Sequence, residues 1–166
     1  MGKTQTVQIY ERRITPIERV RFNRAPYTIV LVVTRIKGKI TGKMLRNAVT
    51  KVQQRHVNLR VRIKTDNNQI PWFTSEGVQE IPIKIVPRES EDHWIQVYHE
   101  ACKVTFEFEE RPAIRLILVQ SPDISELLIF SHHIICDGIS LAYLARDLMV
   151  HLWDPTLDVE MLHLYI

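Results

Sequence analysis

The sequence has few cysteines, few glycines and no long apolar segment. Its 166 residues include 2 Cys, 5 Gly and 8 Pro. That is too little cysteine for a disulfide-rich scaffold, and too little glycine and proline for a collagen-like or low-complexity chain. The longest purely aliphatic run, 29–33, is far shorter than the roughly 20 apolar residues that a membrane-spanning helix needs. Hydrophobic residues still make up 45% of the chain, which is enough to build the core of one domain.

The weak net charge limits the partners that we expect. Lys+Arg 22 against Asp+Glu 19 leaves +3, much less than the basic surface of a typical nucleic-acid-binding protein, so no nucleic-acid partner is expected. The N-terminal sequence MGKTQTVQIYERR lacks the apolar stretch of a secretion signal, and neither cysteine lies in a CxxC motif. We therefore expect a reducing, cytoplasmic location. Six basic residues could form either a solvated helix face or a docking surface for an acidic partner: Lys37, Lys39, Lys43, Arg46, Lys51 and Arg55.

Hydrophobic periodicity predicts a mixed β-sheet covered by helices. The two strongest strands, 113–120 and 124–133, are joined by the turn Ser121-Pro122-Asp123, so they should pair antiparallel. Because strands and helices interleave while hairpins are also present, we expect an α/β (α+β) fold with two or three helices on one side of the sheet. Further strands are predicted at 7–12, 27–36, 59–64, 69–74 and 81–86. Helices are predicted after Thr15, at 41–55, at 91–103 with Ser90 as its cap, at 138–151 and at 158–164.

Residues 131–138, SHHIICDG, form the segment most indicative of chemistry. A predicted strand ends in two adjacent histidines, and an aspartate and a glycine follow just before a helix. Because side chains alternate along a strand, His132 and His133 should point to opposite faces, so at most one of them can enter a given cleft. A loop at the end of a rigid strand is a common place for catalytic residues.

This HHxxxDG pattern resembles the active-site motif of the condensation-domain and chloramphenicol-acetyltransferase-like acyltransferase superfamily. Residues 55–63, RHVNLRVRI, are similar to the family's RHxxLRxxF segment, with Ile63 in place of the usual Phe. Residues 106–115 are more weakly similar to a strand entry of the family. The opening around Thr15 and Glu18 looks most like the polyketide-associated and alcohol acyltransferases. In order and spacing, these pieces match the N-terminal half of the family over nearly the whole chain.

The resemblance implies both a fold and an activity. Residues 1–166 would be a single domain, one half of a chloramphenicol-acetyltransferase-like fold, because family members of the monomeric type are more than twice this length and hold the active-site tunnel between two halves. The absent C-terminal half, or a second chain, would supply the other wall. The activity would be acyl transfer in secondary metabolism, from acyl-CoA or from an acyl-phosphopantetheine thioester on an acyl carrier protein to a hydroxyl or an amine. No bound cofactor is implied, and the isolated chain is expected to be inactive.

The resemblance also assigns roles to the motif residues. The second histidine is the catalytic one in the family, which makes His133 the general base, and the ordinary histidine pKa suits that role. Asp137 would be structural and would form a buried ion pair with Arg60, the arginine that matches the family's segment. An orienting role toward the histidine, as in a Ser-His-Asp triad, is the alternative for Asp137. Gly138 is expected to let the backbone turn sharply into the helix, and His132 to be packed and hydrogen-bonded.

Other interpretations of the same residues remain. Cys136 could act as a nucleophile, but packing is the simpler role at this position. His132, His133, Cys136 and His151 could bind zinc, but adjacent histidines on opposite strand faces are poor joint ligands, so no metal is predicted. In a different functional class, the chain could be a non-catalytic condensation-like domain that binds a carrier protein or another protein partner. The intact motif favours the enzyme, whereas the missing half favours the binding domain.

Overall fold

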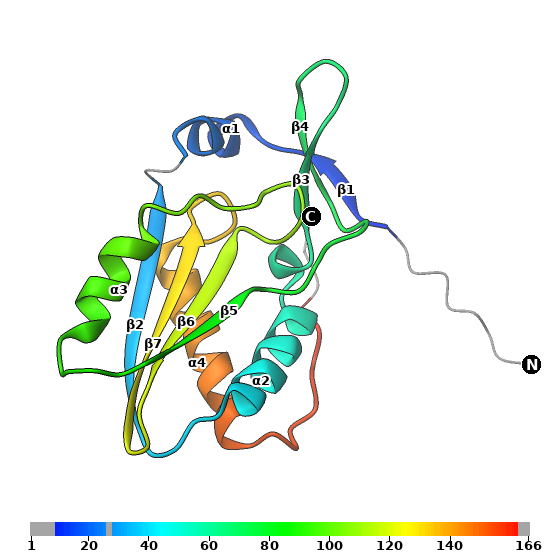
Figure 1. The fold of residues 1–166 in the computed structure, drawn as a ribbon. Helices are drawn as coiled ribbons and strands as arrows, with labels where there is room; N and C mark the ends of the chain where they lie inside the picture. Colours follow the sequence, from blue (N-terminus) through cyan, green and yellow to red (C-terminus); the bar gives the residue numbers. More distant parts are fainter. Residues whose placement is uncertain (1–8, 26–27, 163–166) are drawn as a thin grey trace, which may run out of the picture.

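A four-stranded mixed sheet forms the centre of the computed structural model, which describes residues 9–25 and 28–162 (Figure 1). In order across the sheet, its strands are β2 (Ile29–Lys37), β7 (Ile124–His132), β6 (Ile114–Gln120) and β5 (Ile83–Pro87). β6 and β7 form the predicted antiparallel hairpin, β2 pairs antiparallel with the other side of β7, and β5 pairs parallel with β6. The predicted mixed sheet is therefore confirmed.

The hairpin that carries β7 is closed by its predicted turn. Ser121 Oγ accepts a hydrogen bond from the Ile124 N–H at 3.3 Å, and the Gly38 N–H at the end of β2 donates to the Asp123 carbonyl at 2.7 Å. β7 lies between β2 and β6 and is buried at every position from Ser125 to His132. The strand that ends in the histidine motif is thus held on both sides by backbone hydrogen bonds.

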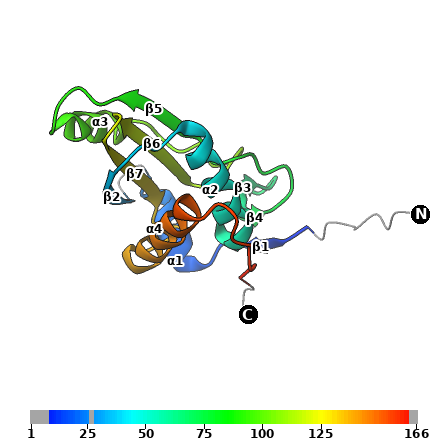
Figure 2. The ribbon, with the colours of Figure 1, turned by 90° about the horizontal axis from the view of Figure 1, so that it is seen from below.

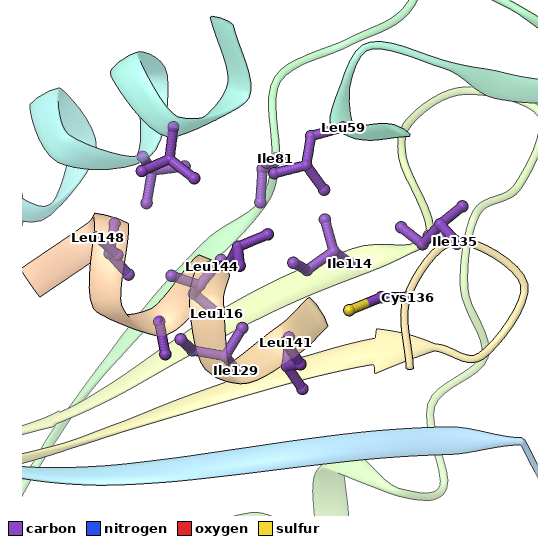
Figure 3. Close-up of a cluster of buried hydrophobic side chains, with 14 of the residues drawn as sticks. Leu59, Ile81, Ile114, Leu116, Ile129, Ile135, Cys136, Leu141, Leu144 and Leu148 are labelled. Atoms are coloured by element: carbon purple, nitrogen blue, oxygen red, sulfur yellow. The ribbon is translucent and has the colours of Figure 1, made fainter. Parts of the chain in front are cut away.

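Two helices, α2 (Gly42–Arg55) and α4 (Gly138–Trp153), cover one face of this sheet. The side chain of Thr41 caps α2 by accepting a hydrogen bond from the Met44 N–H at 3.2 Å. The buried stripe of α4 packs on the apolar side chains of β6 and β7 (Figure 3). The buried apolar residues are Leu45, Ala48, Val49 and Val52 on α2, with Leu141, Leu144, Ala145 and Leu148 on α4.

A third helix, α3 (His93–Ala101), lies on the opposite face of the sheet (Figure 2). Its residues Val97 and Ala101 pack against Val119 and Phe130. Two helices cover one face of the sheet, as predicted, and α3 covers the other face, which the prediction did not include. A central strand such as β7 is apolar on both faces, and both faces need cover. Ser90 does not cap α3 as predicted: Asp92 occupies the N-cap position and makes no side-chain capping bond.

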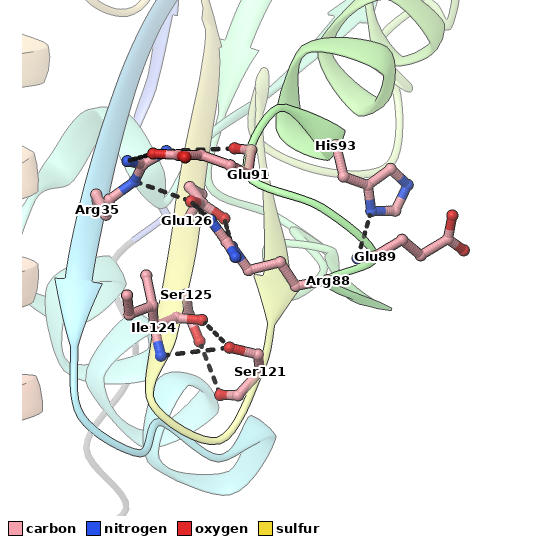
Figure 4. A network of polar contacts seen from close by, with 9 residues as sticks. All are labelled: Arg35, Arg88, Glu89, Glu91, His93, Ser121, Ile124, Ser125 and Glu126. Carbon is pink, nitrogen blue, oxygen red and sulfur yellow. Dashed lines mark hydrogen bonds and ion pairs between the residues drawn. The ribbon is translucent and has the colours of Figure 1, made fainter.

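An ionic cluster ties the segment before α3 to the sheet (Figure 4). Glu126 on β7 is only 1% exposed, and its carboxylate binds Arg35 of β2 and Arg88, which follows β5, each at 2.9 Å. Arg35 also reaches the exposed Glu91 at 3.1 Å. The two guanidinium groups compensate the buried carboxylate, which would otherwise be costly to desolvate.

A second, smaller sheet consists of β1 (Glu11–Arg13), β4 (Pro71–Thr74) and β3 (Arg62–Thr65), in that order. β3 and β4 form the predicted hairpin, whose turn is closed by Asp66: its Oδ1 accepts hydrogen bonds from the N–H groups of Asn68 and Ile70, both at 2.9 Å. The strand predicted at 59–64 begins later than expected, because the 3-10 turn η1 (Val57–Leu59) precedes it.

The N-terminal elements lead from this small sheet toward the histidine motif. The strand predicted at 7–12 begins at Glu11, and residues 7 and 8 lie outside the described residues. α1 (Pro16–Asn23) starts with a capping box in which the side chains of Thr15 and Glu18 each accept a hydrogen bond from the other's N–H. This box explains why the short helix predicted after Thr15 forms.

The chain after α4 returns along α2 without forming the predicted helix at 158–164, of which 163 and 164 lie outside the described residues. Lys51 Nζ donates hydrogen bonds to the carbonyls of Pro155 and Leu157 at 2.7 and 2.5 Å, and Arg55 donates to that of Glu160 at 2.6 Å. These carbonyls are satisfied by side chains of α2 rather than by helical N–H groups. Two of the six clustered basic residues thus anchor the chain itself. Among the described residues, no helix combines the length and apolar character that crossing a bilayer requires.

Candidate active site

The HHxxxDG motif lies where β7 ends and α4 begins. His132 is the last residue of the strand, 133–135 form a turn, and Gly138 is the first residue of the helix. Asp137 is the N-cap of α4: its Oδ1 accepts a hydrogen bond from the Ser140 N–H at 2.8 Å. The motif therefore joins the central strand to the helix that packs on it.

His132 is fully buried below the motif, with 0% exposure. Its Nδ1 accepts a hydrogen bond from the Ile134 N–H at 3.2 Å, and its Nε2 lies 2.5 Å from the hydroxyl of Thr28. The rings of Phe106 and Phe108 meet the imidazole edge-on. Burial, and to a lesser degree the neighbouring His133, lowers the pKa of His132 to about 4. The side chain is therefore neutral at physiological pH.

His133 lies on the turn and is half-buried. Its N–H donates to the Thr28 carbonyl at 2.8 Å, and its own carbonyl accepts a hydrogen bond from Arg21 Nη1 at 3.1 Å. Within the described part of the chain, its ring nitrogen Nδ1 is enclosed without a hydrogen-bond partner. The backbone of this residue is thus held on both sides.

The expected buried ion pair between Asp137 and Arg60 was wrong. Asp137 is exposed, and no ion pair joins the two residues in the described structure, where Arg60 Nε is enclosed without a partner. The hydrogen bonds from Ser140 lower the pKa of the Asp137 carboxyl, and the nearby His133 and Arg21 lower it further. Capping the helix replaces the ion pair as the way in which this carboxylate is stabilised.

Gly138 does not make the sharp turn that we expected. Its φ is not among the positive values of the described residues, and a Cβ at this position would meet no atom within 4 Å. The first position of a helix has ordinary helical dihedrals that any residue can adopt. The conformational freedom of glycine is therefore not what this position requires.

Cys136 is a packed side chain in this structure. It is 8% exposed, and burial raises the pKa of its thiol to about 11. A thiol that is protonated at physiological pH is a poor nucleophile. Among residues 9–25 and 28–162, no group of three or more His, Cys, Asp or Glu side chains is arranged to hold a metal ion.

Three residues that the sequence analysis did not select support the motif. Arg21 and Thr28 bind the two histidines as described above, and Asn58 Nδ2 donates to the Ile135 carbonyl at 3.1 Å. No sequence signal marks Arg21 or Thr28, because each is more than a hundred residues from its partner, with separations of 112 and 104. Asn58 lies inside the RHVNLRVRI segment, but at one of the unspecified positions of RHxxLRxxF, so the similarity to the family does not single it out.

A cavity of about 520 Å³ lies between α3 and strands β5 and β6. His133 does not line it. Phe106 is shared between the cavity wall and the surroundings of His132. The histidine motif therefore stands at the end of the sheet rather than inside this cavity.

The family model described as the condensation domain matches residues 12–152. The chain belongs to the condensation-domain family.

Two curated relatives show the range of similarity. The hybrid PKS-NRPS synthetase xenE of Xenoacremonium sinensis is 32% identical over 114 residues, which cover 68% of this chain and 3% of that protein. Bacitracin synthase 1 of Bacillus licheniformis is 25% identical over 146 residues, which cover 84% of this chain and 3% of that protein.

Solved structures of condensation-type domains show the same fold. The epimerization domain from the third module of tyrocidine synthetase B superposes with a TM-score of 0.77 at 18% identity, covering 93% of this chain and 38% of that one. The first condensation domain of the calcium-dependent antibiotic synthetase superposes with a TM-score of 0.71 at 16% identity, covering 93% and 40%. The predicted chloramphenicol-acetyltransferase-like fold is confirmed, and the chain spans about two-fifths of the length of these two structures.

Proposed function

We propose that this condensation-family chain carries the general base of an enzyme that forms an amide or ester by acyl transfer from a thioester. The observation that supports this most directly is the geometry of the two histidines. His132 is buried and neutral, while His133 follows it on a turn at the end of the central strand. A base at this position is attached to the sheet through its backbone, and it is less buried than His132.

The proposed chemistry uses the imidazole of His133 as a proton acceptor beside an acyl thioester. His133 would take the proton of the acceptor amine or hydroxyl while the acceptor's lone pair attacks the thioester carbonyl. The tetrahedral intermediate then collapses, the C–S bond breaks, and the thiolate leaves with the proton that the histidine has taken up. No covalent intermediate on the protein is needed. We propose no nucleophilic role for Cys136, whose thiol is buried and protonated.

The donor and the second wall of the site are part of the same proposal. The curated relatives named above are synthetases, and this supports a thioester on the phosphopantetheine of a carrier protein over free acyl-CoA. Since the chain spans about two-fifths of the solved domains, we propose that 1–166 is the N-terminal half of the catalytic unit. The other half would come from a longer polypeptide or from a second chain. A reducing, cytoplasmic location would suit the two free cysteines.

A thiol-release assay with acyl-CoA and acyl-carrier-protein donors tests this function. In the catalytically complete form, whether one chain or two, His133→Ala should lower acyl transfer by about 10²- to 10⁴-fold, the usual contribution of a general base. The 166-residue chain alone should show little or no transfer. Robust turnover by the monomeric chain would refute the half-site proposal. Full activity of the His133→Ala variant in the complete form would refute the general base. A complete wild-type form that transfers no acyl group from either donor would leave a domain that only binds the carrier protein.

A further inference from the structure

A closed ring of hydrogen bonds joins α1, the residue that precedes β2 (Thr28) and the histidine motif. It runs from the side chain of Arg21 to the His133 carbonyl, and from the His133 N–H to the Thr28 carbonyl. It continues from His132 Nε2 to the Thr28 hydroxyl at 2.5 Å and from that hydroxyl to the Arg21 carbonyl at 3.2 Å. Thr28 thus binds the motif through both its backbone and its side chain, whereas Arg21 binds the motif through its side chain and Thr28 through its backbone carbonyl.

The donors and acceptors of this ring determine where each proton lies. The Ile134 N–H donates to His132 Nδ1 at 3.2 Å, so Nδ1 carries no proton and the neutral ring holds its proton on Nε2. Nε2 therefore donates to Thr28 Oγ1, and the Thr28 hydroxyl proton is free to donate to the Arg21 carbonyl. In this tautomer both ring nitrogens of the buried His132 have a hydrogen-bond partner. In the other tautomer, Nδ1 and the Ile134 nitrogen would each carry a proton pointing at the other, and their hydrogen bond would be lost.

The ring also restrains the backbone on both sides of His133. The peptide N–H is held by the Thr28 carbonyl and the peptide carbonyl by the Arg21 guanidinium. With both peptide groups fixed, the imidazole can reorient only through its two side-chain torsions. A misplacement of about 1 Å can cost a catalytic group on the order of 100-fold in rate.

We propose that Arg21 and Thr28 are positioning residues for His133: they clamp both of its peptide groups, and Thr28, together with the Ile134 N–H, holds the neighbouring His132 in a single tautomer. This inference rests on the proposed general-base function of His133. It adds that the base is oriented from α1 and from the residue that precedes β2, more than a hundred residues away in sequence, rather than by Asp137.

Nuclear magnetic resonance of the 166-residue chain tests the clamp without any activity. At neutral pH, long-range ¹H–¹⁵N spectra should show His132 neutral with its proton on Nε2, and this proton should exchange slowly because the residue is 0% exposed. Thr28→Val should shift or remove that resonance, whereas Thr28→Ser should keep it. Thr34→Val makes the same exchange on β2 opposite Leu127 and serves as the control. An unchanged His132 spectrum in Thr28→Val would overturn the clamp.

Kinetics of the catalytically complete form test the consequence for the reaction. Thr28→Val and Arg21→Gln should each lower kcat by about 10- to 100-fold with KM within about twofold, and Thr28→Ser should restore most of the rate. Arg19→Gln, which changes an exposed arginine of the same helix, is the control. Wild-type kcat in both clamp variants, or a loss confined to KM, would overturn the proposal.

The two proposals can fail separately. Full transfer by His133→Ala would refute the general base, whatever the spectra of His132 show. An inactive His133→Ala variant together with fully active Thr28→Val and Arg21→Gln variants would refute the clamp and leave the general base standing.

Discussion

Acid should destabilise this chain through His132, and the size of the effect follows from its surroundings. Burial lowers the pKa of this histidine from 6.5 to about 4. In the unfolded chain His132 is therefore protonated below about pH 6.5, whereas in the folded chain it is protonated only below about pH 4. Because the folded pKa is the lower one, the stability is fully present above pH 6.5 and falls with decreasing pH. At about 1.4 kcal/mol for each pKa unit, the loss between pH 7.5 and pH 4.5 is about 2.5 kcal/mol.

Urea unfolding at several pH values, compared between the wild type and His132→Gln, measures this loss. Glutamine keeps a donor toward Thr28 but does not titrate, so the difference in unfolding free energy should shrink by about 2.5 kcal/mol between pH 7.5 and 4.5. Burial also lowers the pKa values of His56 and His151. These histidines are present in both proteins, so their contributions cancel in the difference.

A difference between the two proteins that does not change with pH would refute the reasoning. It would mean that His132 titrates alike in the folded and unfolded chains, and that its burial and its bonds to Thr28 and Ile134 do not hold it neutral. A direct ¹H–¹³C titration of the His132 ring in the wild type provides a second measurement, which does not depend on how well the variant folds. A midpoint near 6.5 in that titration would contradict the structure in the same way.

Two further predictions concern stability. Glu126→Ala should lower the free energy of unfolding, measured in urea, by about 3–5 kcal/mol, because Arg35 and Arg88 then lose the buried carboxylate that they bind. Glu91→Ala, which removes the exposed carboxylate of the same cluster, should cost less than about 1 kcal/mol, and equal losses would contradict the buried cluster. Asp137→Ala should cost only about 1 kcal/mol, the value of an N-cap, and Asp137→Ser should recover most of it. A loss as large as that of a broken buried ion pair would favour a carboxylate partner that the structure does not show.

The regular elements could be predicted where local patterns are strong. The hairpin of β6 and β7 follows from two apolar runs around a Ser-Pro-Asp turn, and α2 follows from one apolar stripe after a threonine cap. These signals depend on the spacing of neighbouring residues, which the sequence contains in full. The prediction that His132 and His133 point to opposite faces rests on the same local alternation, and in the structure His132 is buried while His133 lies on the turn after the strand.

The sequence by itself thus determined the mixed sheet, most of its strands and helices, and the position of the histidine motif between β7 and α4. Only the tertiary structure decided that α3 covers the second face of the sheet, that Asp137 caps a helix instead of pairing with Arg60, and that the described residues after α4 form no helix. It also decided that Arg21 and Thr28 bind the motif. The physical reason is that periodicity and capping are local, whereas the partner of a polar side chain is whichever group the fold brings within about 3 Å, often from more than a hundred residues away.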